Sequence, residues 1–342
     1  MGLLRLLPIL VALSSCSDGS PSRRDGSNDG PRPDLLRPDS APVADGRLPD
    51  GSTGPWVKIL KPASGATLQN PVTFTVTAQD VATVRLFADA WPLGPAWDPA
   101  ASDQLTYTFN GVGYARQIEL FGYDVQGSQL ATDAIQITVS SASTDKGQLV
   151  GQMWNTYYYL ATESGYGGVA DTTLYDAQCA PIVKVSAAFS DSVCIEGSGK
   201  LNDGRVINFA KTCSCGRPCP TGGIICYSVL DKTKYPWGMG AASNALVPLR
   251  SWAVDKSQIP LGTILYAEQW DGVAVPKVDG LGGFTHDGCF RADDVGGAIS
   301  GLHYDYFAAT KGIWQALEKI HKTKSSFTVY KNPGRCAHLQ SP

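Results

Sequence analysis

Short runs of alternating hydrophobic and polar residues follow one another between Trp56 and Val139, and Pro, Gly, Asn or Asp separates them. A period of two is typical of strands that bury one face, and such residues favour the turns between strands. The predicted strands are 56–60, 72–78, 82–89, 105–111, 116–124 and 134–140. Six or seven short strands at this spacing predict a β-sandwich, which we place at residues 56–141 and expect to act mainly as a spacer.

The C-terminal part, residues 147–342, shows a mixed pattern. Apolar and aromatic runs predict strands at 154–163 and 325–332, and a Pro-Leu-Gly turn predicts another strand near 259–266. Between 308 and 322 the spacing of Ile313, Leu317 and Ile320 predicts a helix with one buried face.

The N-terminus carries an apolar run from Leu6 to Leu13 followed by Leu-Ser-Ser-Cys. A run this short cannot span a bilayer, which needs about 20 apolar residues. It therefore predicts an export signal at residues 1–16 ending in a lipobox, with Cys16 as the lipidated first residue of the mature protein. An ordinary cleaved signal peptide is the alternative, and the choice between inner and outer membrane stays open.

Residues 17–55 contain no aromatic side chain and are rich in Pro, Gly, Ser, Asp and Arg. Such a segment has too little apolar surface to form a core, which predicts a disordered tether. A flexible chain of this length spans on the order of 35 Å, enough to carry the following domains away from a membrane.

Eight of the nine cysteines lie in the C-terminal part, and only Cys16 lies outside it. An even number of cysteines in an exported chain predicts four disulfides of unknown pairing. These cysteines are Cys179, Cys194, Cys213, Cys215, Cys219, Cys226, Cys289 and Cys336. A zinc site formed by Cys213, Cys215, Cys219 and Cys226 is the alternative, although their spacing matches no common zinc motif.

The charge and the motifs exclude several classes of function. A net charge of −3 and an isoelectric point near 5.8 disfavour nucleic-acid binding. The sequence contains no phosphate-binding P-loop, no zinc-protease helix and no Gly-x-Ser-x-Gly turn, and the four histidines match no catalytic motif.

Three aspartates remain as candidate catalytic residues. Asp255 lies in AVDKSQIPLGTILY, Asp294 in RADDVGGAI and Asp305 in SGLHYDYF. Gly296 and Gly297 would let the backbone adopt a positive φ or approach a ligand closely, which would place Asp294 at the floor of a groove. Aromatic neighbours would desolvate Asp305 and raise its pKa. For each aspartate the simpler alternative is the capping of a turn.

The order of these motifs resembles the three-aspartate domain of bacterial cell-wall enzymes, whose pattern is V-D-x-x-x-I-P-L-G-T, D-T-G-G-A-I-x-G and then I-D. The resemblance implies a six-stranded double-psi β-barrel, shared with lytic transglycosylase A. The C-terminal part is longer than a minimal domain of this kind, so we expect an all-β fold in which the barrel carries a disulfide-rich insertion and the predicted C-terminal helix. Residues 56–141 resemble the bacterial immunoglobulin-like domains. The sequence departs from the pattern at Val295, Ser300 and Tyr304. Asp293 has no counterpart, and we expect a solvated turn residue.

The resemblance also implies roles for the candidate residues. Asp305 would be the single acid and base that cleaves peptidoglycan glycan strands, Asp294 would support it electrostatically, and Asp255 would brace the site. No metal or organic cofactor is implied, and a monomer is expected. Glu163 is a further candidate carboxylate. Candidate sugar-stacking residues are Tyr157, Tyr159, Trp237 and Trp252, with Gly296 and Gly297 in the groove. The alternatives are a non-catalytic wall-binding or expansin-like module and a β-glycan hydrolase on the same fold.

Overall fold

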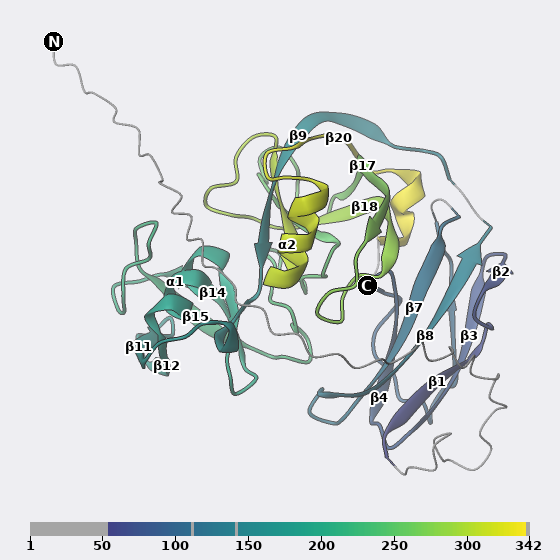
Figure 1. Cartoon of the computed structure of the whole chain (residues 1–342), viewed down its shortest axis with the longest axis horizontal. Coiled ribbons are helices and arrows are strands. Elements are labelled where there is room, and N and C mark those ends of the chain that lie inside the picture. The colour runs from purple at the N-terminus through teal and green to yellow at the C-terminus, as the bar shows by residue number, and fades with distance from the viewer. Residues whose placement is uncertain (1–53, 111–112, 141–142, 340–342) are drawn as a thin grey trace, which may run out of the picture. The chain divides into compact units, whose positions relative to one another are not determined.

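The N-terminal domain is a β-sandwich of two sheets in a computed structural model that describes residues 54–110, 113–140 and 143–339 (Figure 1). One sheet has the order β1-β3-β6 and the other the order β2-β8-β7-β4-β5. The bounds are β1 Trp56–Lys61, β2 Ala66–Leu68, β3 Val72–Gln79, β4 Thr83–Ala88, β5 Trp91–Pro92, β6 Gln104–Tyr107, β7 Ala115–Tyr123 and β8 Gln129–Val139. Phe74, Leu86 and Leu120, from strands of both sheets, belong to one buried core. The predicted sandwich is confirmed, and β2 and β5 are short additions to it.

The predicted signal peptide, the Cys16 lipid anchor and the tether up to residue 53 lie outside the described residues. Among the residues that are described, no helix is long and apolar enough to cross a bilayer.

The C-terminal domain is built on a closed barrel of six strands in the order β16-β18-β17-β20-β9-β19. The bounds are β9 Gln148–Tyr159, β16 Ser251–Val254, β17 Ile264–Val275, β18 Phe284–Asp294, β19 His303–Ala309 and β20 Ser326–Lys331. The pairs β16 with β18 and β19 with β9 are parallel, and the other pairs are antiparallel. Met153, Trp270, Phe290 and Phe327 are fully buried members of its core. The predicted barrel is confirmed.

A disulfide-rich insertion separates β9 from the rest of the barrel. Its bounds are β10 Ala161–Thr162, η1 Glu163–Gly165, β11 Ala170–Tyr175, β12 Pro181–Ser186, α1 Ala187–Glu196, β13 Ser198–Lys200, β14 Val206–Thr212 and β15 Ile225–Leu230. The strands form a sheet β10-β13-β14-β15 and a hairpin β11-β12. Phe189 and Val193 of α1 pack into the buried core of this unit.

The eight described cysteines form four disulfides, as predicted. Three bridges lie in the insertion, and the fourth ties β18 to the 3-10 helix η2, Gly334–Leu339. The pairs are Cys179 with Cys215, Cys194 with Cys219, Cys213 with Cys226, and Cys289 with Cys336. The four cysteines considered for zinc are therefore distributed over three disulfides.

Helix α2, Lys311–Ile320, covers one side of the barrel (Figure 1). The Thr310 side chain caps it by accepting a hydrogen bond from the backbone N–H of Ile313. The helix begins later than predicted because residues up to Ala309 still belong to β19. Ile313 and Leu317 are buried as predicted, whereas Ile320 remains 38% exposed.

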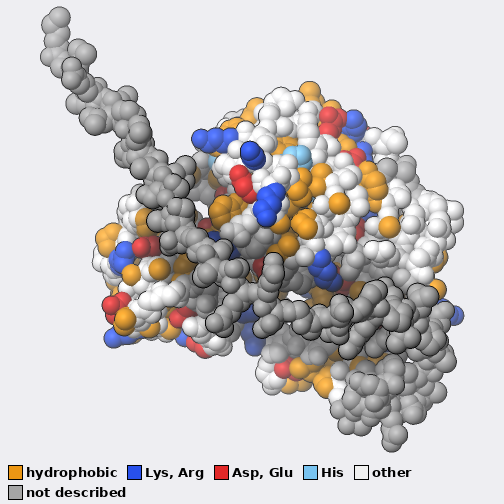
Figure 2. Space-filling view, viewed as in Figure 1, with side chains coloured by type: hydrophobic (Ala, Val, Ile, Leu, Met, Phe, Trp, Pro, Cys, Tyr) orange, Lys and Arg blue, Asp and Glu red, His pale blue; other side chains and the backbone are white. Residues whose placement is uncertain are grey.

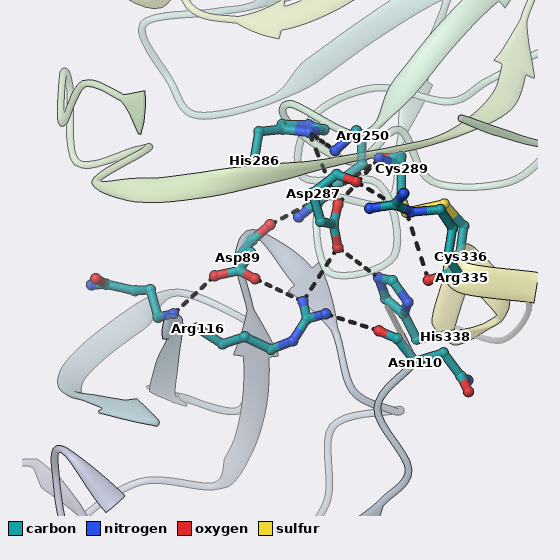
Figure 3. Close-up of polar contacts among 12 residues, drawn as sticks. Asp89, Asn110, Arg116, Arg250, His286, Asp287, Cys289, Arg335, Cys336 and His338 are labelled. Carbon is teal, nitrogen blue, oxygen red and sulfur yellow. Dashed lines mark hydrogen bonds and ion pairs between the residues drawn. A yellow bond between two sulfur atoms is a disulfide. The ribbon is translucent and has the colours of Figure 1, made fainter. Parts of the chain in front are cut away.

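A cluster of buried charges joins the sandwich to the barrel (Figure 3). The Asp287 carboxylate on β18 contacts Arg250 at 2.5 Å, Arg116 of β7 at 3.3 Å and His338 at 3.2 Å. Arg116 also pairs with Asp89 of the sandwich at 2.9 Å. All five side chains are at most 6% exposed. Buried charges of both signs thus compensate one another across this junction.

On the part of the face drawn in colour in Figure 2, acidic and basic side chains are interspersed and do not form one continuous patch of either sign. This distribution agrees with the small net charge of the sequence.

Candidate functional site

Four neighbouring barrel strands place the two central aspartates on one face. Ala253 of β16 is in register with Asp305 of β19 on one side and with Asp294 of β18 on the other. Asp305 is in register with Thr156 of β9 on its far side. Residues in register point to the same face of a sheet, and strands lie about 4.8 Å apart, so the two aspartate backbones are about 10 Å apart. The small Ala253 side chain separates them.

Asp305 is held by a short chain of polar contacts. The Thr156 hydroxyl donates a hydrogen bond of 2.8 Å to Oδ1 of Asp305 and lies 2.9 Å from Nε2 of His303. Because Thr156 has only one hydroxyl proton, His303 must be the donor in the second contact when Asp305 is ionised. The pKa of Asp305 is raised to about 7: burial and, to a smaller extent, the charge of Asp294 raise it, and the Thr156 hydrogen bond lowers it. Near neutral pH the carboxyl can therefore both donate and accept a proton.

The Asp294 carboxylate accepts two hydrogen bonds, whereas Asp305 accepts one from Thr156. The backbone N–H of Val295 donates to Oδ1 at 2.9 Å, and the Tyr158 hydroxyl makes a long hydrogen bond of 3.4 Å to Oδ2. Burial raises the pKa of Asp294 to about 6, against the effect of these two donors. The two carboxyls therefore titrate at different pH values, with Asp294 ionising first.

The glycines after Asp294 do not adopt the positive φ that was one of the two roles predicted for them. Gly296 and Gly297 do not adopt a positive φ, whereas Gly301 has a φ of 62°. A Cβ atom at Gly296 would lie 2.7 Å from Cγ1 of Ile299, while one at Gly297 would meet only open space. Gly296 is thus required for close packing of its own loop, and the backbone freedom expected at this pair is needed at Gly301.

Asp255 lies at the end of β16 and makes structural contacts. Its Oδ1 accepts hydrogen bonds from the backbone and the hydroxyl of Ser257, and its Oδ2 accepts one of 2.8 Å from the backbone N–H of Gly301. These donors lower the pKa of Asp255, so it stays ionised at neutral pH. Asp255 connects the turn after β16 to the loop before β19, which fits a residue that braces the site.

Asp293 is not the solvated turn residue that we expected. It is only 2% exposed, its Oδ1 accepts a hydrogen bond of 2.5 Å from Nε of Arg291, and its Oδ2 accepts one from the Ser251 hydroxyl. The Arg291 guanidinium lies over the ring of Trp91, 4.8 Å from its centre. β18 extends through Asp294, so Asp293 is part of a strand and is compensated by a buried partner.

A third carboxyl with a raised pKa comes from the insertion. Glu196, the last residue of α1, accepts a hydrogen bond of 3.0 Å from the backbone N–H of Tyr159 on β9. The pKa of Glu196 is raised to about 7, mainly by burial, against the hydrogen bond from Tyr159, which lowers it; the charge of Asp305 contributes to the rise. No motif marks Glu196 in the sequence, because only the fold of the insertion brings it towards Asp305. Glu163, the carboxylate considered from the sequence, instead accepts a hydrogen bond from the backbone N–H of Asn202.

Two of the four predicted sugar-stacking residues belong to the barrel interior. Trp252 is fully buried and stacks on Tyr304 and Phe290, which leaves no surface for a sugar and corrects its predicted role. Tyr157 packs against the barrel core, and its hydroxyl donates to the backbone carbonyl of His321.

The other two lie outside the barrel interior. Tyr159 stacks on Trp314 with 5.9 Å between ring centres, and its hydroxyl lies 3.3 Å from that of Tyr166. Trp237, on the segment before β16, packs against a cluster that includes Tyr158 and Ala253. Ala253 is the residue in register with both Asp294 and Asp305. Of the four predicted aromatic residues, Trp237 is therefore the one that packs beside these two aspartates.

Among the residues that the structure describes, two groups of side chains bring potential metal-ligand atoms close together. They are Cys179 with Cys215 and Cys226, and Asp287 with Cys289 and His338. Every cysteine in them is part of a disulfide, so it offers no thiolate while the bridges are intact.

Comparisons with known proteins give one family match and several weak structural similarities. No curated protein matches the chain. A structure of Escherichia coli MltA with bound chitohexaose is 16% identical at a TM-score of 0.38, covering 54% of this chain and 73% of that one. A membrane-bound lytic murein transglycosylase from Agrobacterium tumefaciens is 12% identical at a TM-score of 0.38, and the match covers 64% of this chain and 77% of that one. The fibronectin(III)-like modules of Clostridium thermocellum CbhA are 22% identical at a TM-score of 0.22, and the match covers 25% of this chain and 99% of that one. Residues 250–327, which contain Asp255, Asp294 and Asp305, match the 3D domain family.

Proposed function

We propose that this protein is a lytic transglycosylase of the bacterial cell envelope that cleaves the glycan strands of peptidoglycan. The observation that carries the proposal is the pair Asp294 and Asp305, which flank Ala253 on one face of the barrel and have separated pKa values of about 6 and about 7. Both residues lie in the segment that matches the 3D domain.

In this mechanism Asp305 is the single acid and base. Its carboxyl protonates the glycosidic oxygen, and the C1–O bond to the leaving sugar breaks. The resulting carboxylate then takes the proton of the 6-hydroxyl group of the same sugar, whose oxygen attacks C1 and closes a 1,6-anhydro ring. Asp294, ionised at neutral pH, stabilises the positive charge that develops on the sugar ring.

The valine after Asp294 does not argue against catalysis. The resemblance has threonine at this position, and loss of its hydroxyl would matter if it oriented Asp294. Here the backbone N–H of Val295 and the hydroxyl of Tyr158 supply hydrogen bonds to that carboxylate. The observed donors therefore do not depend on the side chain at position 295.

Hydrolysis is the second candidate, and Glu196 is the observation that favours it. A carboxylate near a catalytic acid can activate water, and glycoside hydrolases use two such groups. The two chemistries differ in the role of this residue. Glu196→Gln should abolish cleavage by a hydrolase, whereas a transglycosylase that uses Asp305 alone should keep forming 1,6-anhydro ends.

We also propose that the protein works as an exported monomer with a lipid anchor at Cys16. The Leu-Ser-Ser-Cys sequence after a short apolar run supports the anchor, and the segment 17–55 would give the domains reach towards the cell wall. Peptidoglycan or a related glycan is the partner that this location and the site favour.

Digestion of purified sacculi followed by mass spectrometry tests the proposed function. The wild-type protein should release fragments with 1,6-anhydro ends, one water lighter than hydrolytic products, and Asp305→Asn should release none while still binding sacculi. Asp98→Asn, at an exposed turn of the sandwich, is the matched control and should cleave normally. Reducing ends would favour the hydrolase, and binding without fragments from the wild-type protein would favour a wall-binding module.

A further inference from the structure

An exposed tryptophan, Trp154, lies beside Asp305 on the same face of the barrel. Trp154 of β9 is in register with His303 of β19, and two residues further on Thr156 is in register with Asp305. The Thr156 hydroxyl contacts both His303 and Asp305, which places all four side chains on one face. Two residues along a strand span about 6.6 Å, so the tryptophan lies within about one sugar ring of the acid.

The indole ring of Trp154 is fixed by its neighbour. It stacks on the His303 imidazole with 3.5 Å between ring centres and 9° between ring planes. His303 itself is only 4% exposed, and its Nε2 is held by Thr156. One face of the indole is therefore covered, and the ring has a single support against which a ligand can press.

Part of Trp154 is open to solvent. The residue is 37% exposed, whereas Trp252 and Trp270 of the same barrel are fully buried. Leu302, which precedes His303 and accepts a hydrogen bond from the backbone N–H of Trp154, is 39% exposed. Exposure of neighbouring large apolar side chains is costly in water and marks a binding surface when it lies beside a reactive group.

We propose that the free face of Trp154 stacks on a pyranose ring of the glycan, in the subsite next to the bond that Asp305 cleaves. The C–H groups on one face of a pyranose make an apolar surface that matches an indole, while its hydroxyl groups point outwards to water or polar groups. A rigid, supported ring binds with little loss of side-chain freedom. The proposal rests on the proposed function and names a residue that the sequence analysis did not include.

His303 has a second consequence as a positioning residue. It supports the indole through its ring and Thr156 through Nε2, and Thr156 in turn donates to Asp305. A sugar pressed on Trp154 therefore contacts the same rigid unit that orients the acid. This arrangement fixes the distance between the bound ring and the Asp305 carboxyl.

Binding of chitohexaose, a hexamer of β-1,4-linked N-acetylglucosamine, tests the platform by calorimetry in the Asp305→Asn background, which does not cleave. Adding Trp154→Ala should weaken binding about tenfold, a loss of about 1.4 kcal/mol that lies in the range of aromatic stacking, and Trp154→Phe should weaken it less than about threefold. Trp154→Leu keeps an apolar side chain over His303 but removes the flat ring, so its affinity should resemble that of the alanine variant. Because the leucine still covers His303, a loss of affinity in this variant would not be due to a folding defect. Leu130→Ala, at a residue of the sandwich that is 43% exposed, is the matched control and should bind normally.

The outcomes separate this inference from the proposed function. The Asp305→Asn parent and its Trp154→Ala and Trp154→Leu variants could bind the hexamer and sacculi with equal affinity. That result would overturn the stacking role of Trp154, even if the wild-type protein forms 1,6-anhydro ends. A parent that binds neither the hexamer nor sacculi would also overturn it. If the wild-type protein leaves reducing ends while the variants lose affinity, the platform stands and the transglycosylase mechanism fails.

Discussion

Replacement of the proposed catalytic acid should stabilise the protein. Asp305 has a pKa of about 7 in the folded chain, against an ordinary value of 3.8, because burial disfavours the charged carboxylate. In Asp305→Asn the amide keeps a similar shape and its oxygen can still accept the Thr156 hydrogen bond, but it never becomes charged. The substitution therefore removes a cost that the wild-type protein bears above acidic pH.

The size and the pH range of the effect follow from the two pKa values. Because the folded-state pKa is raised, the contribution of Asp305 to wild-type stability is greatest below about pH 4 and is lost as pH rises towards about 7, where the folded protein also loses the proton. The difference between 3.8 and about 7 corresponds to about 4 kcal/mol, since one pKa unit is worth about 1.4 kcal/mol. Allowing for imperfect hydrogen bonding of the amide, we expect Asp305→Asn to be about 2 to 4 kcal/mol more stable at pH 8 and nearly equal to wild type at pH 4.

Urea unfolding of the oxidised protein at pH 4, 6 and 8 measures this difference. Asp255→Asn is the matched control, because hydrogen bonds lower the pKa of Asp255 and its substitution should give no stabilisation at pH 8. If Asp305→Asn is no more stable than wild type at pH 8, the carboxyl is not desolvated and the argument for its role as an acid fails.

Three further predictions concern activity, the domain junction and the anchor. Cleavage of sacculi should be fastest between about pH 6 and 7 and about tenfold slower at pH 8, because it needs protonated Asp305 and ionised Asp294. Asp294→Asn should slow cleavage and remove the decline in rate on the acid side. A pH profile that this substitution leaves unchanged would contradict the assigned roles. Arg116→Met should lower the free energy of unfolding by about 3 to 5 kcal/mol at pH 7, because it leaves buried acidic groups poorly compensated. Arg217→Met, at an exposed ion pair, should lower it by less than about 1 kcal/mol, and equal losses would refute the distinction. Cys16→Ser should move the protein from the membrane fraction to the soluble fraction, and sedimentation with membranes would contradict a lipid anchor.

The sequence was informative where the chemistry is local. Alternation of apolar residues located the sandwich strands, and an even number of cysteines in the C-terminal part indicated four disulfides. The motifs around Asp294 and Asp305 placed both residues correctly in a barrel, because each motif includes the strand that carries its aspartate.

The sequence was uninformative where a residue depends on a distant partner. Asp293 resembles a turn residue until Arg291 and Ser251 are seen to compensate it. Glu196 gains its raised pKa from burial between the insertion and β9, which no local pattern records. Trp252 differs from Trp154 only in the direction of the side chain, inside or outside a barrel whose closure is a property of the whole domain.

The buried charges around Asp287 bear on how the chain can be divided. A barrel separated from the sandwich would lose Arg116 and the Asp89 carbonyl that binds Arg250, and it would expose Asp287 to water on one side. The sandwich alone would in turn keep Asp89 and Arg116 without their partners from the barrel. The barrel domain therefore includes part of its neighbour as an electrostatic lining, and gene fusions or truncations that exchange the N-terminal domain must preserve this lining to preserve the barrel.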